Sequence, residues 1–551
     1  MSDNINPIFQ APSQNPNPDD SQPLAPPPEM EYQSQQELYQ AAQNWAKEHG
    51  YAIIITHSST SNGENRFTYQ CDKSGSCHSH KKEGDQLSKT KKTNCPFKMS
   101  GNFYKKRGVW QIKIKDPNHN HSPSSDPSIH PIHRRLNEDQ KSLVTQLTNA
   151  GVAPLKIKSA LMQQSDAPPS ATLNTIYNHC NQLRSNLLEG RTSIEALIFE
   201  IRKNNFYHMI EISPGNSHMS SLFFAHPQSL TLSSKRFPTT FILDCTYKTN
   251  KFHMPLLHII GINSCNKSFS IALCFMPAEK KDNYAWALEQ LFISLDQISP
   301  SVLLTDNEQA LINAITKVFP NSTHLLCSWH IFKNIQLHCR KHFKSEEEWS
   351  NFRMKWNNLI QSSSVSEYQN NFTEFSVYWN PPTCYYLIKN IFPLKEKFVS
   401  CFINKHLHFG NTVTSRIEGL HSYIKRFVNT STSSLSAVVK QIHQALTIQL
   451  HERFIEAAQH SYKQLTGLPP SIQNLNGQIS HYALKTIHSF HMAKPPNSTC
   501  SGSYTSHMGM PCIHQVHEAK RKGTKFQPED FHLQWHIKKE LDVSFFFKLW
   551  V

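Results

Sequence analysis

Two aspartates stand at the ends of apolar runs, where a buried strand would leave the core. Asp244 follows Phe241-Ile242-Leu243, and Asp306 follows Val302-Leu303-Leu304-Thr305. Either residue could simply cap the next turn or helix, but two such strand ends side by side would make an acidic pocket. Phosphoryl transfer needs two hard cations about 3.5 to 4 Å apart, and clustered carboxylates supply oxygen ligands for them. We therefore expect a third carboxylate to join this pair.

A second group of residues has the spacing of a metal site. Four soft or borderline ligands at turn-separated positions suit tetrahedral zinc, and Trp110 on the preceding strand is expected to pack beneath them. Histidines that follow the first cysteine could compete as ligands or belong to a mobile loop, and in a chain with 32 histidines chance clustering is the alternative. The set is Cys71, Cys95, His119 and His121, and the competitors are Cys77, His78 and His80.

Charge and cysteine usage set the class of protein. The formal net charge is +15, and residues 68–115 hold 12 Lys and Arg against three acidic residues, a balance that favours a polyanion such as nucleic acid. The alternative is a solvated basic surface. Thirteen cysteines without a signal sequence indicate reduced thiols and a nuclear or cytosolic setting. The longest apolar runs fall far short of the roughly 20 residues of a membrane helix.

The order of periodicities predicts several domains. A Pro-, Asn- and Gln-rich start, residues 1–34, indicates a disordered tail, and residues 35–125 combine one helix with four strand-like pieces. Helical periodicity at 136–188 predicts three short helices, either a helix-turn-helix or a plain linker within residues 126–235. An α/β core begins at about residue 236, with expected strands at 240–246, 254–263, 269–277, 301–305 and 324–327 and helices at 282–295 and 308–318.

Three stretches then carry a family resemblance. Phe241-Ile242-Leu243-Asp244-Cys245-Thr246-Tyr247-Lys248-Thr249-Asn250, Leu303-Leu304-Thr305-Asp306-Asn307-Glu308-Gln309-Ala310 and Leu326-Cys327-Ser328-Trp329-His330 resemble the Mutator-like element (MULE) transposase domain. The resemblance implies a ribonuclease-H-like fold over residues 236–430, an Asp-Asp-Glu triad that uses Mg²⁺ or Mn²⁺, and a helical insertion at about 331–409.

The family's third acidic residue lies on a helix after the insertion. Glu418, in residues 411–425, matches that helix, and Ile417, Leu420 and Ile424 would face the core beside it. Its rivals, which have no matching context, are Glu346, Glu347, Glu348 and Glu374. Cys327 and His330 match the family's Cys-x-x-His signature, which serves either the fold or the organisation of the active site.

The zinc candidates carry a second resemblance. Tyr69-Gln70-Cys71, Asn94-Cys95-Pro96-Phe97 and His119-Asn120-His121 resemble the WRKY/GCM-type DNA-binding domain of the far-red-impaired-response family. Lysines would contact phosphates there, and Arg107 or the strand edges would reach bases. Cys500, Cys512 and His514, in residues 491–520, resemble a SWIM zinc module that has Gly502 in place of one cysteine, so that zinc binding needs His507 as a substitute ligand.

These patterns together predict a nuclear DNA transposase of the Mutator-like class. It would bind element ends as a homo-oligomer on double-stranded DNA and would have no membrane span. A helical region at 431–490 and a tail at 521–551 complete the expected organisation. Two alternatives stay open: a domesticated transposase that regulates transcription without catalysis, and a ribonuclease-H-like nuclease that acts on RNA or hybrids.

Overall fold

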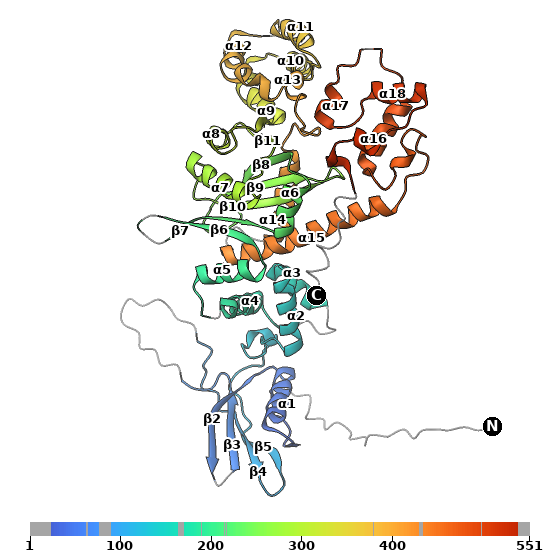
Figure 1. Cartoon of the computed structure of the whole chain (residues 1–551). Helices are drawn as coiled ribbons and strands as arrows, with labels where there is room; N and C mark the ends of the chain where they lie inside the picture. Colours follow the sequence, from blue (N-terminus) through green and yellow to red (C-terminus); the bar gives the residue numbers. More distant parts are fainter. Residues whose placement is uncertain are drawn as a thin grey trace, which may run out of the picture. The chain divides into compact units, whose positions relative to one another are not determined.

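The computed structural model divides the chain into two compact units, Met1–Glu189 and Gly190–Val551. Each unit is considered by itself (Figure 1). The residues that the structure describes are 24–61, 64–76, 90–163, 170–188, 190–213, 215, 218–377, 379–428, 433–497 and 499–537. Cys77, His78 and His80 and most of the expected tail at 1–34 lie outside them. None of the helices in these ranges is long and apolar enough to cross a membrane.

Unit 1 is built on a five-stranded antiparallel sheet with one helix across its face. The strands are β1 (Glu31–Tyr32), β2 (Ile53–Ser61), β3 (Glu64–Cys71), β4 (Lys98–Tyr104) and β5 (Val109–Asp116), in the order β1-β5-β4-β3-β2. Helix α1 (Gln35–Glu48) is capped by Ser34, whose hydroxyl accepts from the Glu37 amide. The helix buries Leu38, Ala42 and Ala46 against the sheet. Gly101 permits this approach, since a Cβ there would lie 3.2 Å from Leu38.

Part of the expected disordered tail is ordered. The carbonyl of Ala25 accepts hydrogen bonds from the Trp45 indole at 3.0 Å and from the Tyr51 hydroxyl at 2.9 Å. β1 then pairs with β5. Two buried side-chain donors thus find their acceptor in a proline-rich stretch whose composition alone indicates disorder.

The three helices expected after the zinc ligands are present. They are α2 (Glu138–Asn149), α3 (Pro154–Gln163) and α4 (Leu173–Leu188), and they bury Val144, Ile157, Leu161 and Ile176 in a common cluster. The next helix, α5 (Ser193–Lys203), belongs to unit 2, where it packs on α15 (Leu435–Tyr462).

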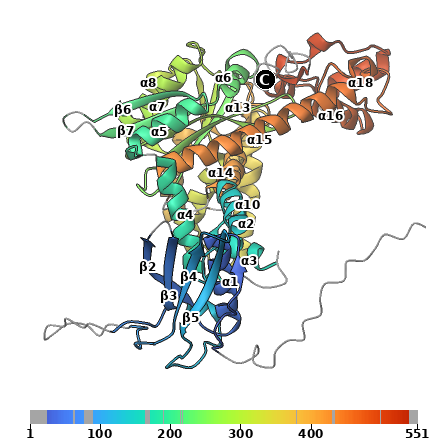
Figure 2. The same cartoon turned by 90° about the horizontal axis from the view of Figure 1, so that it is seen from below.

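Unit 2 contains a seven-stranded mixed sheet with helices on both faces (Figures 1 and 2). The strand order is β12-β11-β8-β9-β10-β7-β6. β8 and β11 are parallel, as are β11 and β12, whereas all other neighbours are antiparallel. The strands are β6 (Tyr207–Ile212), β7 (Met219–Ala225), β8 (Thr240–Thr246), β9 (Leu256–Ile262), β10 (Ser268–Phe275), β11 (Val302–Thr305) and β12 (Thr323–Leu326). All five strands expected in the core are therefore present, within a few residues of the predicted bounds.

The two faces of this sheet hold separate apolar clusters. α6 (Pro227–Lys235), α7 (Lys281–Ser294) and α8 (Gln309–Val318) pack on one face. α5, α14 (Ser415–Phe427) and α15 pack on the other, and Figure 2 shows α15 lying along that face. Alternate strand residues serve alternate clusters: Phe223 joins the first and Phe224 the second. The sheet is thus buried from both sides, which explains its continuous apolar strands.

Two expected boundaries are wrong. Residues 207–225, expected within a helical linker, form β6 and β7, because Leu222 and Phe224 complete the cluster beneath α5. The expected tail at 521–551 is packed over its described part: Trp535 is fully buried, and the Gln534 amide donates to the Ile262 carbonyl at 2.8 Å. An apolar cluster that includes Phe409 and Ile487 surrounds Trp535.

The expected insertion is mostly helical and has its own core. Its helices are α9 (Ser328–Cys339), α10 (Glu346–Ile360), α11 (Val365–Ser376), α12 (Pro381–Tyr386) and α13 (Ser400–Ile403). Trp349 and Trp356 are buried at its centre. Beyond α15, the chain continues with α16 (His481–Met492), α17 (Ser503–Met508) and α18 (Ile513–Lys522), which form a smaller lobe of unit 2 in Figure 1.

Candidate functional site: three carboxylates and two Cys/His clusters

Strand register places Asp244 beside Asp306. β8 and β11 run parallel with Phe241 opposite Leu303 and Ile242 opposite Leu304, and each aspartate lies two residues beyond its isoleucine or leucine. Alternate residues share a face, so both carboxylates project towards the side of the sheet on which α14 packs. Burial, followed by the charge of Asp306, raises the pKa of Asp244 from 3.8 to about 7. Two like charges that are removed from water repel each other, and a bound cation would stabilise both of them.

Helix α14 brings Glu418 to the same place. Ile417 and Leu420 pack in one apolar cluster with Ile242 and Leu304, and Ile424 is buried too, as the sequence predicts. The buried part of this helix therefore sits on the residues that precede the two aspartates. Glu418 lies in the first turn of α14, its side chain is 45% exposed, and its charge contributes to the raised pKa of Asp244.

Cys327 and His330 both contact Thr414, the residue that precedes α14. The amide and the hydroxyl of Thr414, the residue before this helix, each lie 3.3 Å from the Cys327 sulfur. The same hydroxyl is 3.2 Å from His330 Nδ1, and His330 Nε2 is 3.8 Å from Glu418 Oε1. The Cys-x-x-His motif at the beginning of α9 thus links the second and third carboxylate-bearing segments.

The electrostatics of this motif follow from its contacts. Burial opposes ionisation of Cys327, but hydrogen bonds with His330 and Thr414 outweigh it and lower its pKa below the usual 9.0. Hydrogen bonding to Cys327, with the charges of Asp306 and Asp244, raises the pKa of His330 above 6.5. The charge that His330 gains on protonation would offset part of the repulsion among the carboxylates.

Two histidines that the sequence reasoning missed flank Asp244. His258 is its cross-strand partner on β9, and His421, one turn after Glu418, has Nδ1 3.8 Å from Asp244 Oδ2. Their rings lie 5.4 Å apart. Burial lowers the pKa of His421 to about 4, so that it is neutral at pH 7. The signal for His421 was its position three residues after Glu418, on one helix face.

A further carboxylate, Glu308, lies beyond Asp306. Its Oε2 accepts a hydrogen bond of 2.5 Å from the Tyr284 hydroxyl, which also lies 3.3 Å from the Cys245 sulfur. Burial, and then the charges of Glu279 and Asp306, raise the pKa of Glu308 to about 7.

The donor chemistry of the three carboxylates fits hard divalent cations. In the described part of the chain, the ligand atoms within each of the two Cys/His clusters all lie within 4.8 Å of one another. The oxygens of the three carboxylates are more widely spaced than this. A pair of divalent ions would span a wider set of carboxylate ligands than a single ion does. The rival glutamates lie apart from this set, on the insertion: Glu346 pairs with Arg340 and Glu374 with Lys355.

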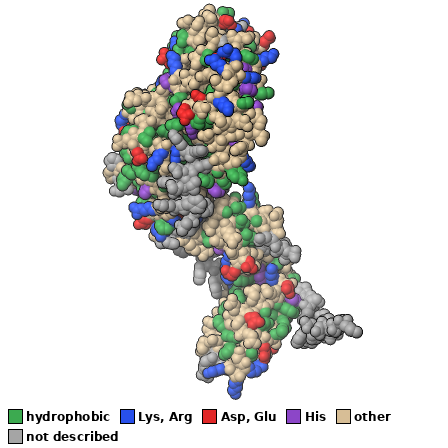
Figure 3. Space-filling model, turned by 45° about the vertical axis from the view of Figure 1, so that its right-hand side comes forward, with side chains coloured by type: hydrophobic (Ala, Val, Ile, Leu, Met, Phe, Trp, Pro, Cys, Tyr) green, Lys and Arg blue, Asp and Glu red, His purple; other side chains and the backbone are tan. Residues whose placement is uncertain are grey.

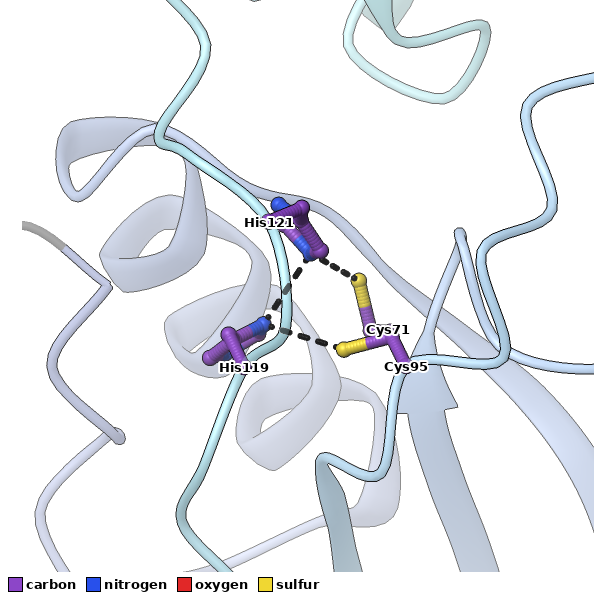
Figure 4. Close-up of side chains that lie close together, drawn as sticks. All are labelled: Cys71, Cys95, His119 and His121. Carbon is purple, nitrogen blue, oxygen red and sulfur yellow. Dashed lines mark hydrogen bonds between the residues drawn. The ribbon is translucent and has the colours of Figure 1, made fainter.

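The first Cys/His cluster closes in unit 1 (Figure 4). His121 Nε2 lies 3.3 Å from Cys71 Sγ, His119 Nδ1 lies 3.4 Å from Cys95 Sγ, and the two imidazole nitrogens are 3.3 Å apart. Burial, then the neighbouring His121, lowers the pKa of His119 to about 4, which leaves it neutral. Two cysteine sulfurs and two imidazole nitrogens suit tetrahedral zinc.

The aromatic support of this cluster differs from the expectation. The ring of His119 stacks on Phe97 at 4.5 Å and meets Tyr51 at 4.7 Å. Trp110 contacts Phe67 and Phe103 instead. Trp110 points into the core beneath α1, because alternate residues of β5 face the helix.

Basic residues share the face of this sheet that α1 leaves open. Lys113 and Lys115 alternate with the inward-facing Ile112 and Ile114 on β5. Burial, then the charges of Arg66, Lys98 and Lys113, lower the pKa of Lys115, which places these four cations close together. Figure 3 shows Lys and Arg side chains at the free end of unit 1. Arg107, expected to reach bases, forms an ion pair with Glu31.

The second Cys/His cluster has three ligands in the described residues. The sulfurs of Cys500 and Cys512 are 3.5 Å apart, and His514 Nδ1 is 3.9 Å from Cys512. His507, the expected substitute, lies outside this group: its Nδ1 bonds the Ser503 carbonyl at 2.7 Å, and its ring stacks on His408. Its position in α17 directs the imidazole towards the residues before α14.

Comparisons with known proteins match both regions. The model of the MULE transposase domain matches residues 240–334, which include Asp244, Asp306, Cys327 and His330. The model of transcription factor AFT matches residues 32–123, which include all four residues of the first cluster.

Similar proteins come from a fungus and a plant. The PKS-NRPS hybrid synthetase cheA of Chaetomium globosum is 23% identical over 565 residues, 92% of this chain and 12% of that protein. Protein FAR1-RELATED SEQUENCE 5 of Arabidopsis thaliana is 23% identical over 360 residues, 63% of this chain and 44% of that protein. Protein FAR-RED IMPAIRED RESPONSE 1 of Arabidopsis thaliana is 22% identical over 422 residues, which are 73% of this chain and 49% of that protein. The chain spans less than half the length of each. Residues 240–334 therefore resemble the MULE transposase domain, and the chain is similar to the far-red-impaired-response proteins.

Proposed function

We propose that the protein is a DNA transposase of the Mutator-like class, and that Asp244, Asp306 and Glu418 hold its catalytic ions. The observation that carries this proposal is the parallel register of β8 and β11, which aligns the two aspartates on the face covered by α14. The strand order β12-β11-β8-β9-β10, antiparallel on one side of β8 and parallel on the other, fits a ribonuclease-H-like core.

Each part of the site then has a task. Two Mg²⁺ or Mn²⁺ ions supply Lewis acidity to the attacking and leaving oxygens of a phosphodiester. The charges of Asp306 and Glu418 add to burial in raising the pKa of Asp244 to about 7, so a bound cation would stabilise its ionised form. His330 and Thr414 fix the approach of Glu418. Water and then a 3′ hydroxyl serve as nucleophiles for cleavage and strand transfer.

Unit 1 is proposed to recognise the ends of the element. A structural zinc ion on Cys71, Cys95, His119 and His121 would hold the loops around β3, β4 and β5, and the cations of the open sheet face suit DNA phosphates. We place the Cys500, Cys512 and His514 cluster as a second structural zinc site of the SWIM type. A nuclear location and a homo-oligomer that pairs two DNA ends accompany this function.

A transcription regulator without catalysis is the second candidate. The match of residues 32–123 to transcription factor AFT favours it, as does the similarity to the far-red-impaired-response proteins. In that case unit 1 would bind DNA and the carboxylates would serve no reaction. A ribonuclease-H-like nuclease on RNA would leave the cluster in unit 1 without a task.

Cleavage of end-labelled DNA from beside the protein's own gene separates these functions. We expect strand breaks with Mn²⁺ or Mg²⁺, none with EDTA, and at least a hundredfold loss in Asp306→Asn. Asp282→Asn is the matched control, because Asp282 is an exposed residue on α7. Tight DNA binding with no cleavage by the unsubstituted protein would overturn the transposase and support the regulator.

A further inference from the structure

An exposed tryptophan, Trp329, lies beside His330, the histidine that approaches Glu418. Trp329 is 46% exposed, whereas Trp349, Trp356 and Trp535 are at most 3% exposed. It lies in the first turn of α9, between Cys327 and His330, the two residues that hold the start of α14. A large apolar ring left in water at this place has no role in the core of the insertion.

The surroundings of this indole suit a flat anionic ligand. The ring meets His330 edge to face with centroids 4.7 Å apart, and Lys333 Nζ lies 5.0 Å from the Trp329 ring. His330 is in turn 3.8 Å from Glu418. The indole and its neighbouring ammonium group therefore lie beside His330, which approaches Glu418.

A nucleobase with its phosphate combines these properties. The base stacks on the indole, and the ammonium of Lys333 pairs with the phosphate. In an intact duplex the neighbouring base pairs cover both faces of a base, so only an unpaired or extruded base can stack in this way. A protein ligand would have to share the space with the DNA strand that the three carboxylates attack.

On this basis we propose that Trp329 and Lys333 form a stacking site for one unpaired nucleotide beside the scissile phosphate. The site rests on the proposed function, since it assigns a DNA strand to the carboxylates. It gives the enzyme a preference for distorted or frayed DNA ends over continuous duplex. Trp329 acts as a binding residue and takes no part in proton or phosphoryl transfer.

The experiment measures stacking without catalysis. A forked DNA duplex carries 2-aminopurine as the unpaired nucleotide at its junction, and the protein is added in EDTA. Stacking on Trp329 quenches the 2-aminopurine emission, and Trp329→Phe keeps most of the quenching. Trp329→Ala abolishes it and weakens binding of the fork about 5- to 150-fold, the range for one base–aromatic stack, while binding of the fully paired duplex is unchanged.

The control is a similar aromatic and cation pair elsewhere in the insertion, with its tyrosine on α12. Tyr385 is 66% exposed and has Lys389 Nζ 5.4 Å from the centre of its ring. Its neighbour Tyr386 stacks on His338, which lies about 13 Å from Trp329 along α9 by helix rise. Tyr385→Ala leaves both quenching and affinity unchanged. An abasic junction binds equally to wild type and Trp329→Ala.

The two proposals fail in different ways. Equal quenching by wild type and Trp329→Ala, or no quenching by either, would overturn the stacking site even in an enzyme that cleaves DNA. Quenching that depends on Trp329 in a protein that never cleaves with Mn²⁺ would support the stacking site and overturn the transposase.

Discussion

Replacing Asp244 with asparagine should stabilise the metal-free protein at alkaline pH. Burial and the charge of Asp306 raise the pKa of this carboxyl from 3.8 to about 7. The folded chain then binds more protons than the unfolded chain between these two values, so the stability of the wild type falls as pH rises through this window. Asparagine resembles the protonated carboxyl and escapes the loss.

The size of the effect follows from the shift. Raising a carboxyl pKa from 3.8 to about 7 corresponds to roughly 4 kcal/mol once the group is ionised in both states. Roughly 2 kcal/mol of this appears between pH 5.5 and 8.5, because the folded group titrates near the middle of that range. For a unit of the size of unit 2, a change of roughly 2 kcal/mol in the free energy of unfolding shifts Tm by a few degrees.

The assay is thermal unfolding of the full chain in EDTA at several pH values, followed through the transition of unit 2. The advantage of Asp244→Asn over the wild type should grow from pH 5.5 to 8.5. Mn²⁺ should raise the Tm of the wild type and leave the variant nearly unchanged. Asp282→Asn, at an exposed helix start, should be neutral or slightly destabilising at every pH. An Asp244→Asn protein that is less stable than the wild type at pH 8.5 would refute the reasoning.

Three further predictions concern other parts of the chain. Thr414→Val should lower the free energy of unfolding by about 1 to 2 kcal/mol and lower the DNA cleavage rate at least tenfold, because it removes the hydroxyl shared with Cys327 and His330. Thr414→Ser should retain the stability and the cleavage activity, and an equal loss in the serine variant would contradict this explanation. Lys115→Gln should weaken DNA binding regardless of sequence and reduce the salt dependence by about one phosphate contact, measured by fluorescence anisotropy against KCl; an unchanged slope would remove Lys115 from the interface. Cys95→Ser should lower the bound zinc by about one ion per chain and weaken the unfolding transition of unit 1, as measured by elemental analysis and calorimetry; full zinc content would exclude Cys95 as a ligand.

The strands that carry the aspartates could be predicted from local pattern. Apolar runs of four to eight residues that end in polar ones locate β8 and β11 in sequence, and their parallel pairing then aligns Asp244 with Asp306. β6 and β7 escaped this reasoning. Their apolar runs are short, and they become recognisable as buried strands only when α5 and α15 are known to pack on them.

Contacts between distant segments could not be predicted. The Thr414 bonds to Cys327 join residues 87 positions apart, and no local signal marks a threonine as the partner of a Cys-x-x-His motif. His258 lies next to Asp244 only through the antiparallel register of β9. The proximity of Cys71, Cys95, His119 and His121 could be predicted from residue type and spacing. Their aromatic support could not, because the alternation of β5 directs Trp110 into the core and leaves Phe97 to stack on His119.

The most direct test of the central claim is strand transfer by a pre-cleaved DNA end. A duplex from beside the gene with a free 3′ hydroxyl is incubated with a supercoiled plasmid, Mn²⁺ and the full chain. The comparison is wild type, Glu418→Gln and Glu347→Gln, the last an exposed glutamate at the start of α10. The proposed site predicts joined products with wild type and Glu347→Gln and none with Glu418→Gln. Equal joining by all three proteins would contradict the assignment of Glu418 as the third carboxylate.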